Sequence, residues 1–265
     1  MRAYTRARIL RGRALPQREW SGVRVLGYHR IADEPHVLSV RPDRFRRQIE
    51  LALESGLQPL AVADGLDLLD AGEVGGRHFC VTFDDGYLDN LEHAVPVLRE
   101  LGVPATIFVP TSVIDGVSTY WWFADPPPAL TWEQLRELAG EGLVDVQPHT
   151  RTHPWLPRLG EDEAHAEIAG SKRELEERLG KPATVFCYPA GLYGEREARL
   201  VREAGYRAAF TTDPGVNGAG QARDRLKRTL VYWEDGERDF RAKLDGLLDR
   251  PPALRAWLYR RRSAR

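Results

Sequence analysis

The chain has few cysteines, almost no net charge and no long apolar run. It contains two cysteines among 265 residues, Cys80 and Cys187, each inside a strand-like apolar segment. Two buried free thiols are therefore expected, and a disulfide framework is not indicated. A formal net charge of -1 gives no sign of nucleic-acid binding. These shortages argue against a disulfide-stabilised scaffold and against a basic nucleic-acid-binding domain.

Hydrophobic segments of membrane-spanning length are also missing. No stretch approaches the roughly 20 apolar residues that a bilayer requires. The basic N-terminus is not followed by an apolar run of signal-peptide length. We therefore expect a soluble, cytoplasmic protein.

Positive charge gathers at the two ends of the chain. The first thirty residues hold eight arginines against one acid, Glu19, and the final segment LRAWLYRRRSAR holds five arginines and no acid. The ordinary interpretation is a pair of solvated ends, and the alternative is weak peripheral contact with an anionic membrane or polymer. We assign residues 1–22 to a basic extension, 23–250 to one domain and 251–265 to a basic tail.

Short β-branched runs alternate with amphipathic, charge-rich segments. Strands are expected over 23–28, 79–83, 105–109, 143–147, 184–188, 207–211 and 226–232, and helices over 42–55, 88–101, 131–140, 161–179, 195–204 and 237–248. Thr131 with Gln134 makes a capping box at the start of one helix. This alternation predicts an α/β domain built on a parallel sheet or barrel.

One segment, residues 110–129, interrupts the alternation. It has no helical period, contains three consecutive prolines, and carries the adjacent aromatics Tyr120, Trp121 and Trp122. A loop of this length in a compact domain is usually functional. Tryptophans on such a loop suit the apolar faces of sugar rings, and core packing is the equally weighted alternative. We assign Trp121 and Trp122 to substrate binding.

Polar and glycine-rich residues collect at the ends of four expected strands. They are the pair Tyr28-His29, the pair Asp84-Asp85, His149 with His153, and the turn YPAGLYG over residues 188–194. A lone strand-end aspartate is often only a helix cap, but that explanation accounts poorly for all four. Because parallel α/β folds place their sites at the carboxyl ends of strands, we expect these residues to share one site.

The segment HTRTH places His149 and His153 four residues apart. On a helical turn this spacing puts both imidazoles on one face, which suits metal chelation. Alone the pair is a weak signal, and it lacks the internal glutamate of the HExxH signature. Combined with a strand-end aspartate it supplies three protein ligands, the usual number at a catalytic zinc site.

The motifs TFDDGY, HTRTHPWL and FCYPAGLYG, in this order, resemble the polysaccharide deacetylase superfamily, also called the NodB-homology or carbohydrate esterase family four domain. The resemblance covers about residues 23–248 and is strongest to bacterial exopolysaccharide N-deacetylases. It implies a distorted (β/α)7 barrel. It also implies that Asp85, His149 and His153 bind a divalent metal, foremost Zn²⁺, with Co²⁺, Ni²⁺ or Mn²⁺ as alternatives. Asp84 is then the general base that activates water.

The third motif carries the remaining implied roles. By the resemblance, the backbone N–H of Ala190 donates to the oxyanion that forms during acyl transfer. The other residues that we assign to substrate binding in this turn are Tyr188, Pro189, Gly191 and Tyr193.

The chain departs from the family pattern at three places. Cys187 stands where many members have an arginine that braces the base, and TTDPGVN replaces the Asp-x-x-Asp-Trp motif. No histidine follows His165, so the late motif that supplies the usual general acid is missing, and LKRTLV occupies its region. Outside the metal set, His29 is the histidine at the carboxyl end of an expected strand, so we assign it the acid role. The alternative is a hydrogen-bonded cap on the barrel.

These residues predict a metal-dependent hydrolase that removes N-acetyl groups from an acetylated carbohydrate. One alternative on the same fold is an O-acetyl esterase or a hydrolase of small cyclic amides, and the missing late histidine favours the esterase. Another alternative is an inactive carbohydrate-binding domain. The intact set of Asp84, Asp85, His149 and His153 argues against that last option.

Overall fold

The computed structural model describes residues 20–72 and 74–249. Its barrel strands are β1 (Gly22–Tyr28), β5 (Arg77–Asp84), β6 (Ala105–Val109), β7 (Val144–Pro148), β8 (Val185–Cys187), β9 (Ala208–Phe210) and β10 (Thr229–Leu230). The shorter strands are β2 (Arg30–Ile31), β3 (Ser39–Val40) and β4 (Gln58–Pro59).

Helices follow most of these strands. They are α2 (Pro42–Glu54), α3 (Val62–Ala71), α4 (Val95–Leu101), α5 (Thr111–Ile114), α6 (Trp132–Glu141), α7 (Glu161–Leu179), α8 (Glu195–Glu203) and α9 (Glu237–Leu244). A π-helical turn, η1 (Asn90–Ala94), leads into α4, and the 3₁₀ turns are η2 (Leu156–Arg158), η3 (Pro189–Gly191) and η4 (Arg223–Arg225).

Parallel strands form the wall of a distorted (β/α)7 barrel. The main sheet runs in the order β10-β1-β5-β6-β7, with β4 beside β5, and its pairings are parallel. β8 and β9 form a separate parallel ladder, and a bridge between Phe210 and Leu226 joins that ladder to the segment leading into β10. The fold class predicted from the sequence is confirmed.

Side chains connect the wall between β7 and β8, where the described strands form no ladder. Oε1 of Gln147 accepts hydrogen bonds from the backbone N–H of Thr184 at 2.9 Å and of Val185 at 3.1 Å. Nδ1 of His149 lies 2.7 Å from the carbonyl oxygen of Cys187 in β8. These contacts satisfy backbone groups that a ladder would otherwise pair. The side chains of Gln147 in β7 and of His149 just after it therefore hold the barrel together between β7 and β8.

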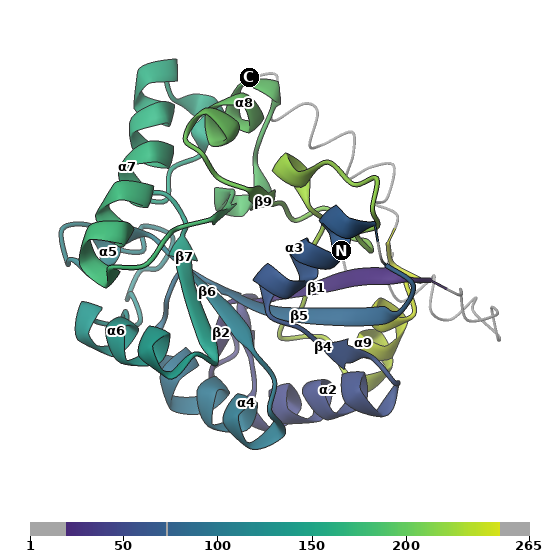
Figure 1. Ribbon diagram of the computed structural model, residues 1–265. Helices are drawn as coiled ribbons and strands as arrows, with labels where there is room; N and C mark the ends of the chain where they lie inside the picture. The colour runs from purple at the N-terminus through teal and green to yellow at the C-terminus, as the bar shows by residue number, and fades with distance from the viewer. Residues whose placement is uncertain (1–19, 73, 250–265) are drawn as a thin grey trace.

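Helix α3 closes the amino end of the barrel. Its Leu66 and Leu69 pack in one cluster with Val25 of β1, Phe108 of β6 and Phe210 of β9. In Figure 1, α3 lies across the strands, whereas α2, α4, α6, α7 and α8 surround them on the outside. Apolar side chains therefore fill this end of the barrel.

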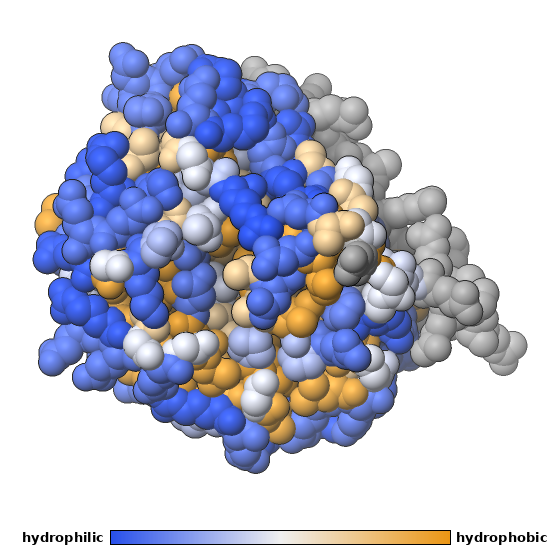
Figure 2. Space-filling model, in the orientation of Figure 1, coloured by the Kyte–Doolittle hydropathy of each residue, from blue (hydrophilic) through white to orange (hydrophobic). Residues whose placement is uncertain are grey.

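Hydrophilic residues cover most of the molecular face seen in Figure 2, notably over α7 and α8. Hydrophobic residues are visible between these surfaces in the lower half of the view. This distribution is typical of amphipathic helices that bury one face against a sheet. Among the described residues, no helix has the length and apolar character needed to cross a membrane.

The sequence patterns do not predict α3. The helix begins after Ala61, which provides no side-chain cap, and Gly65 interrupts its first half. Both features weaken a helix signal. Gly65 allows close packing, because a Cβ at this position would lie 3.3 Å from Sγ of Cys80. Contact with the barrel therefore stabilises a helix that its own sequence barely favours.

Helix α5 (Thr111–Ile114) lies in the segment 110–129, for which no helix was expected, and the other differences concern length. The run expected over 226–232 pairs as a strand only at Thr229–Leu230, because Leu226 bridges to β9 instead of β1. Helix α9 ends at Leu244, before the expected position 248. The capping box of Thr131 and Gln134 is confirmed, and both cysteines are buried free thiols as predicted. The extension over 1–22, except for 20–22, and the tail over 251–265 lie outside the described residues.

Gln147→Met should lower the free energy of unfolding by about 1–3 kcal/mol, because the backbone N–H groups of Thr184 and Val185 lose their acceptor. Chemical denaturation of wild type and variant measures the loss. Gln48→Met is the matched control, since Gln48 is also buried but its Oε1 has no hydrogen-bond partner. Equal effects of the two substitutions would contradict the role given to Gln147.

Candidate active site

The adjacent aspartates at the end of β5 have different environments. Asp84 is the last residue of the strand and lies on the same face as Cys80 and Thr82, which point into the barrel. Asp85 follows with a φ of 74°, in the left-handed region, so the chain turns there. The two residues are buried, at 3% and 2% exposure. The turn lets neighbouring carboxylates serve one site although strand alternation would separate them.

Asp85 faces both histidines of the HTRTH segment. Its Oδ1 lies 3.4 Å from Nε2 of His153 and 3.7 Å from Nε2 of His149. The three candidate ligand atoms lie within 4.8 Å of one another, and all three residues are buried. Ligands about 2.1 Å from a tetrahedral ion lie about 3.4 Å apart. The observed spacing therefore fits a zinc-type ion held by the three residues predicted to bind it.

The electrostatics of this group also fit a divalent cation. Oδ1 of Asp85 is buried without a hydrogen-bond partner. Burial, and then the charge of Asp84, raise the pKa of Asp85 to about 8. A cation would remove both penalties. Burial lowers the pKa of His149 to about 4, so its ring is neutral. Because a carbonyl only accepts, Nδ1 of His149 donates to Cys187 and Nε2 keeps a lone pair for a metal.

The two histidines converge on a loop, so the helical turn expected for HTRTH is wrong. Thr150 and His153 adopt φ values of 67° and 57°, which no α-helix contains. Glu167 of α7 holds the loop instead. Its Oε2 accepts hydrogen bonds from the backbone N–H of Arg151 at 2.8 Å and of Thr152 at 3.0 Å. A carboxylate from a distant helix thus replaces the local hydrogen bonds of a helical turn.

Backbone strain is concentrated in the three motifs. Within the described ranges 20–72 and 74–249, the non-glycine residues with positive φ are Asp85, Thr150, His153 and Ala190. Such conformations cost on the order of 1–3 kcal/mol each and cluster at functional sites. Asp85 and His153 are candidate metal ligands. Thr150 follows the candidate ligand His149, and Ala190 is the predicted donor to the oxyanion. The strain supports the assignment of these motifs to one site.

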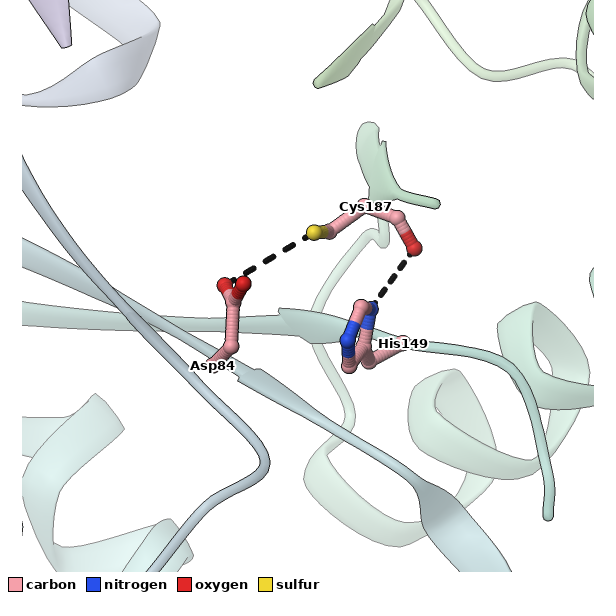
Figure 3. A group of neighbouring side chains, drawn as sticks. All are labelled: Asp84, His149 and Cys187. Carbon is pink, nitrogen blue, oxygen red and sulfur yellow. Dashed lines mark hydrogen bonds between the residues drawn. The ribbon is translucent and has the colours of Figure 1, made fainter. Parts of the chain in front are cut away.

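Asp84, His149 and Cys187 form a second cluster of possible ligand atoms (Figure 3). The thiol lies 3.6 Å from Oδ1 of Asp84. Arg228, however, donates to the two oxygens of Asp84 at 2.6 and 2.7 Å and to Sγ of Cys187 at 3.1 Å. Burial raises the pKa of Cys187 well above its ordinary value, so the thiol stays protonated. A cation here would meet the guanidinium, and the cluster with Asp85 is the better metal site.

Arg228 is the site residue that sequence reasoning missed. It is fully buried, and its Nε also donates to the carbonyl oxygen of Thr211 at 2.9 Å. Burial raises the pKa of Asp84, but the charge of Arg228 and its hydrogen bonds outweigh burial and hold that pKa well below its usual range. The signal was an arginine in LKRTLV, the segment that stands where the late histidine motif is missing. It supplies, from the segment just before β10, the brace that Cys187 cannot provide.

His29 follows β1 and lies beside Asp84. Its Nε2 is 3.8 Å from Oδ2 of Asp84. Its buried Nδ1 has no hydrogen-bond partner. Burial is the main cause that lowers the pKa of His29, so the ring is neutral near pH 7. The structure therefore brings the candidate base and the candidate acid into one group.

The third motif contributes backbone and packing. Ala190 is exposed at the tip of η3, with φ 53° and ψ 12°. Tyr188 is fully buried, its ring stacks on Tyr193 at 5.0 Å, and its hydroxyl donates to the carbonyl oxygen of Asp224 at 2.8 Å. Pro189 and Gly191 are buried as well. The side chains of Tyr188 and Pro189 support the turn that presents Ala190, and Tyr193 remains half-exposed.

The aromatic loop lies against the metal-ligand group. The Trp122 ring is 4.3 Å from the ring of His153, and Nε1 of Trp121 donates to the backbone carbonyl of His153 at 3.3 Å. Trp121 is 55% exposed, whereas Tyr120 is buried. The three aromatics therefore differ in position. Trp121 is available to a ligand, Trp122 is half-buried against a histidine, and Tyr120 belongs to the core.

The chain is similar in sequence to a known family of proteins. The family model described as polysaccharide deacetylase matches residues 71–209. YxkH of Bacillus subtilis (strain 168) is 30% identical over 208 residues, which cover 78% of this chain and 70% of YxkH. The poly-β-1,6-N-acetyl-D-glucosamine N-deacetylase of Escherichia coli (strain K12) is 25% identical, and the match covers 90% of this chain. The chain spans only 41% of that longer protein.

The fold also matches a solved structure. IcaB from Ammonifex degensii superposes with a TM-score of 0.76 at 25% sequence identity. The match covers 88% of this chain and 99% of IcaB.

Arg228→Met should lower the free energy of unfolding by about 3–5 kcal/mol at pH 7, because it leaves a buried carboxylate without its cation. In the native state the pKa of Asp84 is below its unfolded value, near 3.9. The ion pair therefore contributes its full stability above that unfolded pKa, and this stability is lost as the pH falls through the native pKa. The difference between wild type and variant should therefore be largest at neutral pH and shrink in acid. Denaturation curves at several pH values measure it.

The double variant Asp84→Asn with Arg228→Met is the control for this prediction. Removing both partners leaves no unpaired charge, so much of the lost stability should return. A single variant that unfolds like the wild type at pH 7 would contradict the role of Arg228.

Proposed function

We propose that this chain, which belongs to the polysaccharide deacetylase family, is a metal-dependent hydrolase that removes N-acetyl groups from amino sugars of a glycan. The observation that carries the proposal is the convergence of Asp85, His149 and His153 beside Asp84 at the strand ends. The N-deacetylase named in Escherichia coli supports the substrate class. A carbohydrate rather than a nucleic acid is the proposed partner.

The proposed chemistry divides the two aspartates. A divalent ion held by Asp85, His149 and His153 would supply a Lewis acid for the acetyl carbonyl and lower the pKa of a water molecule. Asp84, which its pairing with Arg228 keeps ionised, accepts a proton as that water attacks. The exposed backbone of Ala190 is the candidate donor to the oxyanion.

His29 is the candidate donor to the departing amine. A neutral imidazole must first gain a proton, and Nε2 of His29 lies 3.8 Å from the Asp84 oxygen that would hold one. The proton taken from water can therefore pass from Asp84 to His29 and then to the amine nitrogen. This order reconciles an acid role with a pKa that burial lowers.

Trp121 is the candidate platform for a sugar ring. Its exposed ring is tied to the backbone of His153, so a pyranose stacked on it would lie beside the metal-ligand group. Trp122, Tyr188 and Pro189 act as supports, because their side chains are half-buried or buried, and Gly191 contributes only buried backbone.

Hydrolysis of O-acetyl esters is the second candidate function. The observation that favours it is the lowered pKa of His29, because an alcohol leaving group needs protonation less than an amine does. A binding domain without turnover is disfavoured, since the candidate base, metal ligands and acid lie together.

Substitution of each aspartate tests the division of roles. Asp84→Asn should reduce acetate release from an N-acetylglucosamine oligomer by about 10²–10⁴-fold, because it removes the proton acceptor, while Zn²⁺ affinity stays near the wild-type value. Asp85→Asn should weaken both. Acetate assays and equilibrium dialysis measure the two quantities. Equal loss of metal in both variants would show that the roles are wrongly divided.

His29→Gln tests the acid. The amide substrate should lose about 10²–10⁴-fold in kcat, the usual contribution of a proton donor. An acetate ester with an acidic phenol leaving group should lose far less, because its leaving group needs no proton. Equal losses on the two substrates would instead assign His29 a structural role.

A further inference from the structure

The two oxygens of Asp85 have different surroundings. Oδ2 accepts a hydrogen bond from the Tyr87 hydroxyl at 2.9 Å. Oδ1 has no hydrogen-bond partner and faces Nε2 of His153 at 3.4 Å and Nε2 of His149 at 3.7 Å. One oxygen is therefore occupied by the protein, and the other is directed at the histidines.

Tyr87 is itself fixed by the aromatic loop. It is fully buried, its ring lies 4.6 Å from that of Tyr120, and its oxygen accepts a hydrogen bond from Nε1 of Trp122 at 3.2 Å. Indole N–H can only donate, so the single hydroxyl proton of Tyr87 is left for Asp85. The hydrogen bonds therefore run in one direction, with Trp122 donating to Tyr87 and Tyr87 donating to Asp85.

Two neighbouring side chains of the loop also bind the backbone of candidate ligand residues. The Tyr120 hydroxyl donates to the carbonyl oxygen of Asp85 at 3.0 Å, and Trp121 donates to that of His153 at 3.3 Å. Consecutive residues 120–122 therefore each contact a candidate ligand residue or Tyr87. Such outer hydrogen bonds orient ligands at metal sites.

We propose that Tyr87, held by Trp122, is a positioning residue that makes Asp85 bind the metal through Oδ1 alone. The inference rests on the proposed function, because it assumes the metal group described above. With Oδ2 engaged by the tyrosine, the carboxylate cannot turn to offer both oxygens. Coordination through one oxygen leaves positions on the ion for water and for the acetyl group. The aromatic loop therefore shapes the metal site as well as the surface beside it.

Tyr87→Phe removes the hydroxyl and keeps the ring. We expect its Zn²⁺ affinity, measured by competition with a chromogenic chelator, to fall about 10–100-fold, the usual effect of losing an outer-shell partner. In the Co²⁺-loaded protein, the visible absorption band should shift and change in intensity, because coordination by two carboxylate oxygens alters the ligand field. A loss of packing alone would leave this spectrum unchanged.

Tyr206→Phe is the matched control. Tyr206 is also buried, and its hydroxyl also donates one hydrogen bond, to the carbonyl oxygen of Ile168 at 3.0 Å, but it contacts no candidate ligand. Its Zn²⁺ affinity and Co²⁺ spectrum should match those of the wild type. Trp122→Phe should reduce affinity less than Tyr87→Phe, and combining the two should add little, because both act through one hydroxyl.

The outcomes separate this inference from the proposed function. Wild-type affinity and spectrum in folded Tyr87→Phe would overturn the inference alone. If that variant does not fold, Trp122→Phe decides, and an unchanged affinity and spectrum there would overturn it. A wild-type protein that binds neither Zn²⁺ nor Co²⁺ would overturn the proposed function and this inference together. A wild type that binds metal but releases no acetate would overturn only the proposed function.

Discussion

The buried ion pair between Asp84 and Arg228 is the interaction on which the site depends. Two adjacent carboxylates lie inside or at the mouth of the barrel, where burial and mutual repulsion both favour protonation. Arg228 keeps one of them ionised, with two hydrogen bonds of 2.6 and 2.7 Å. It also reaches the carbonyl of Thr211 and the thiol of Cys187. The pair thereby connects the ends of β5, β8 and β9 with the segment before β10.

The surroundings of Asp85 complement this arrangement. Its neighbour Asp84 has a cation from the protein, whereas Asp85 has only a tyrosine donor and an unpaired oxygen. The chain thus supplies one positive charge for two buried carboxylates. An added cation would balance the second carboxylate. The same electrostatic reasoning explains why the cluster around Cys187 is a poorer metal site although its atoms also lie within 4.8 Å of one another.

Local patterns were sufficient for most of the fold because barrel strands and their helices carry strong periodicity. Helix α7 has the bounds predicted from its pattern, Glu161–Leu179, and β6 likewise matches at Ala105–Val109. Helix α3 was missed, because packing against the barrel stabilises it more than its own residues do. The histidines of HTRTH were correctly grouped for the wrong reason, since Glu167, not a helical turn, shapes their loop.

The sequence by itself predicted a parallel sheet or barrel through its periodicity, and the resemblance of its motifs to a known family predicted the candidate ligands Asp85, His149 and His153, with Asp84 beside them. Only the tertiary structure decided what surrounds them. Arg228 lies 144 positions from the carboxylate that it braces, and Trp122 acts on Asp85 through Tyr87. Such partners are brought together by closure of the barrel and by the path of one loop, and spacing along the chain carries no record of either.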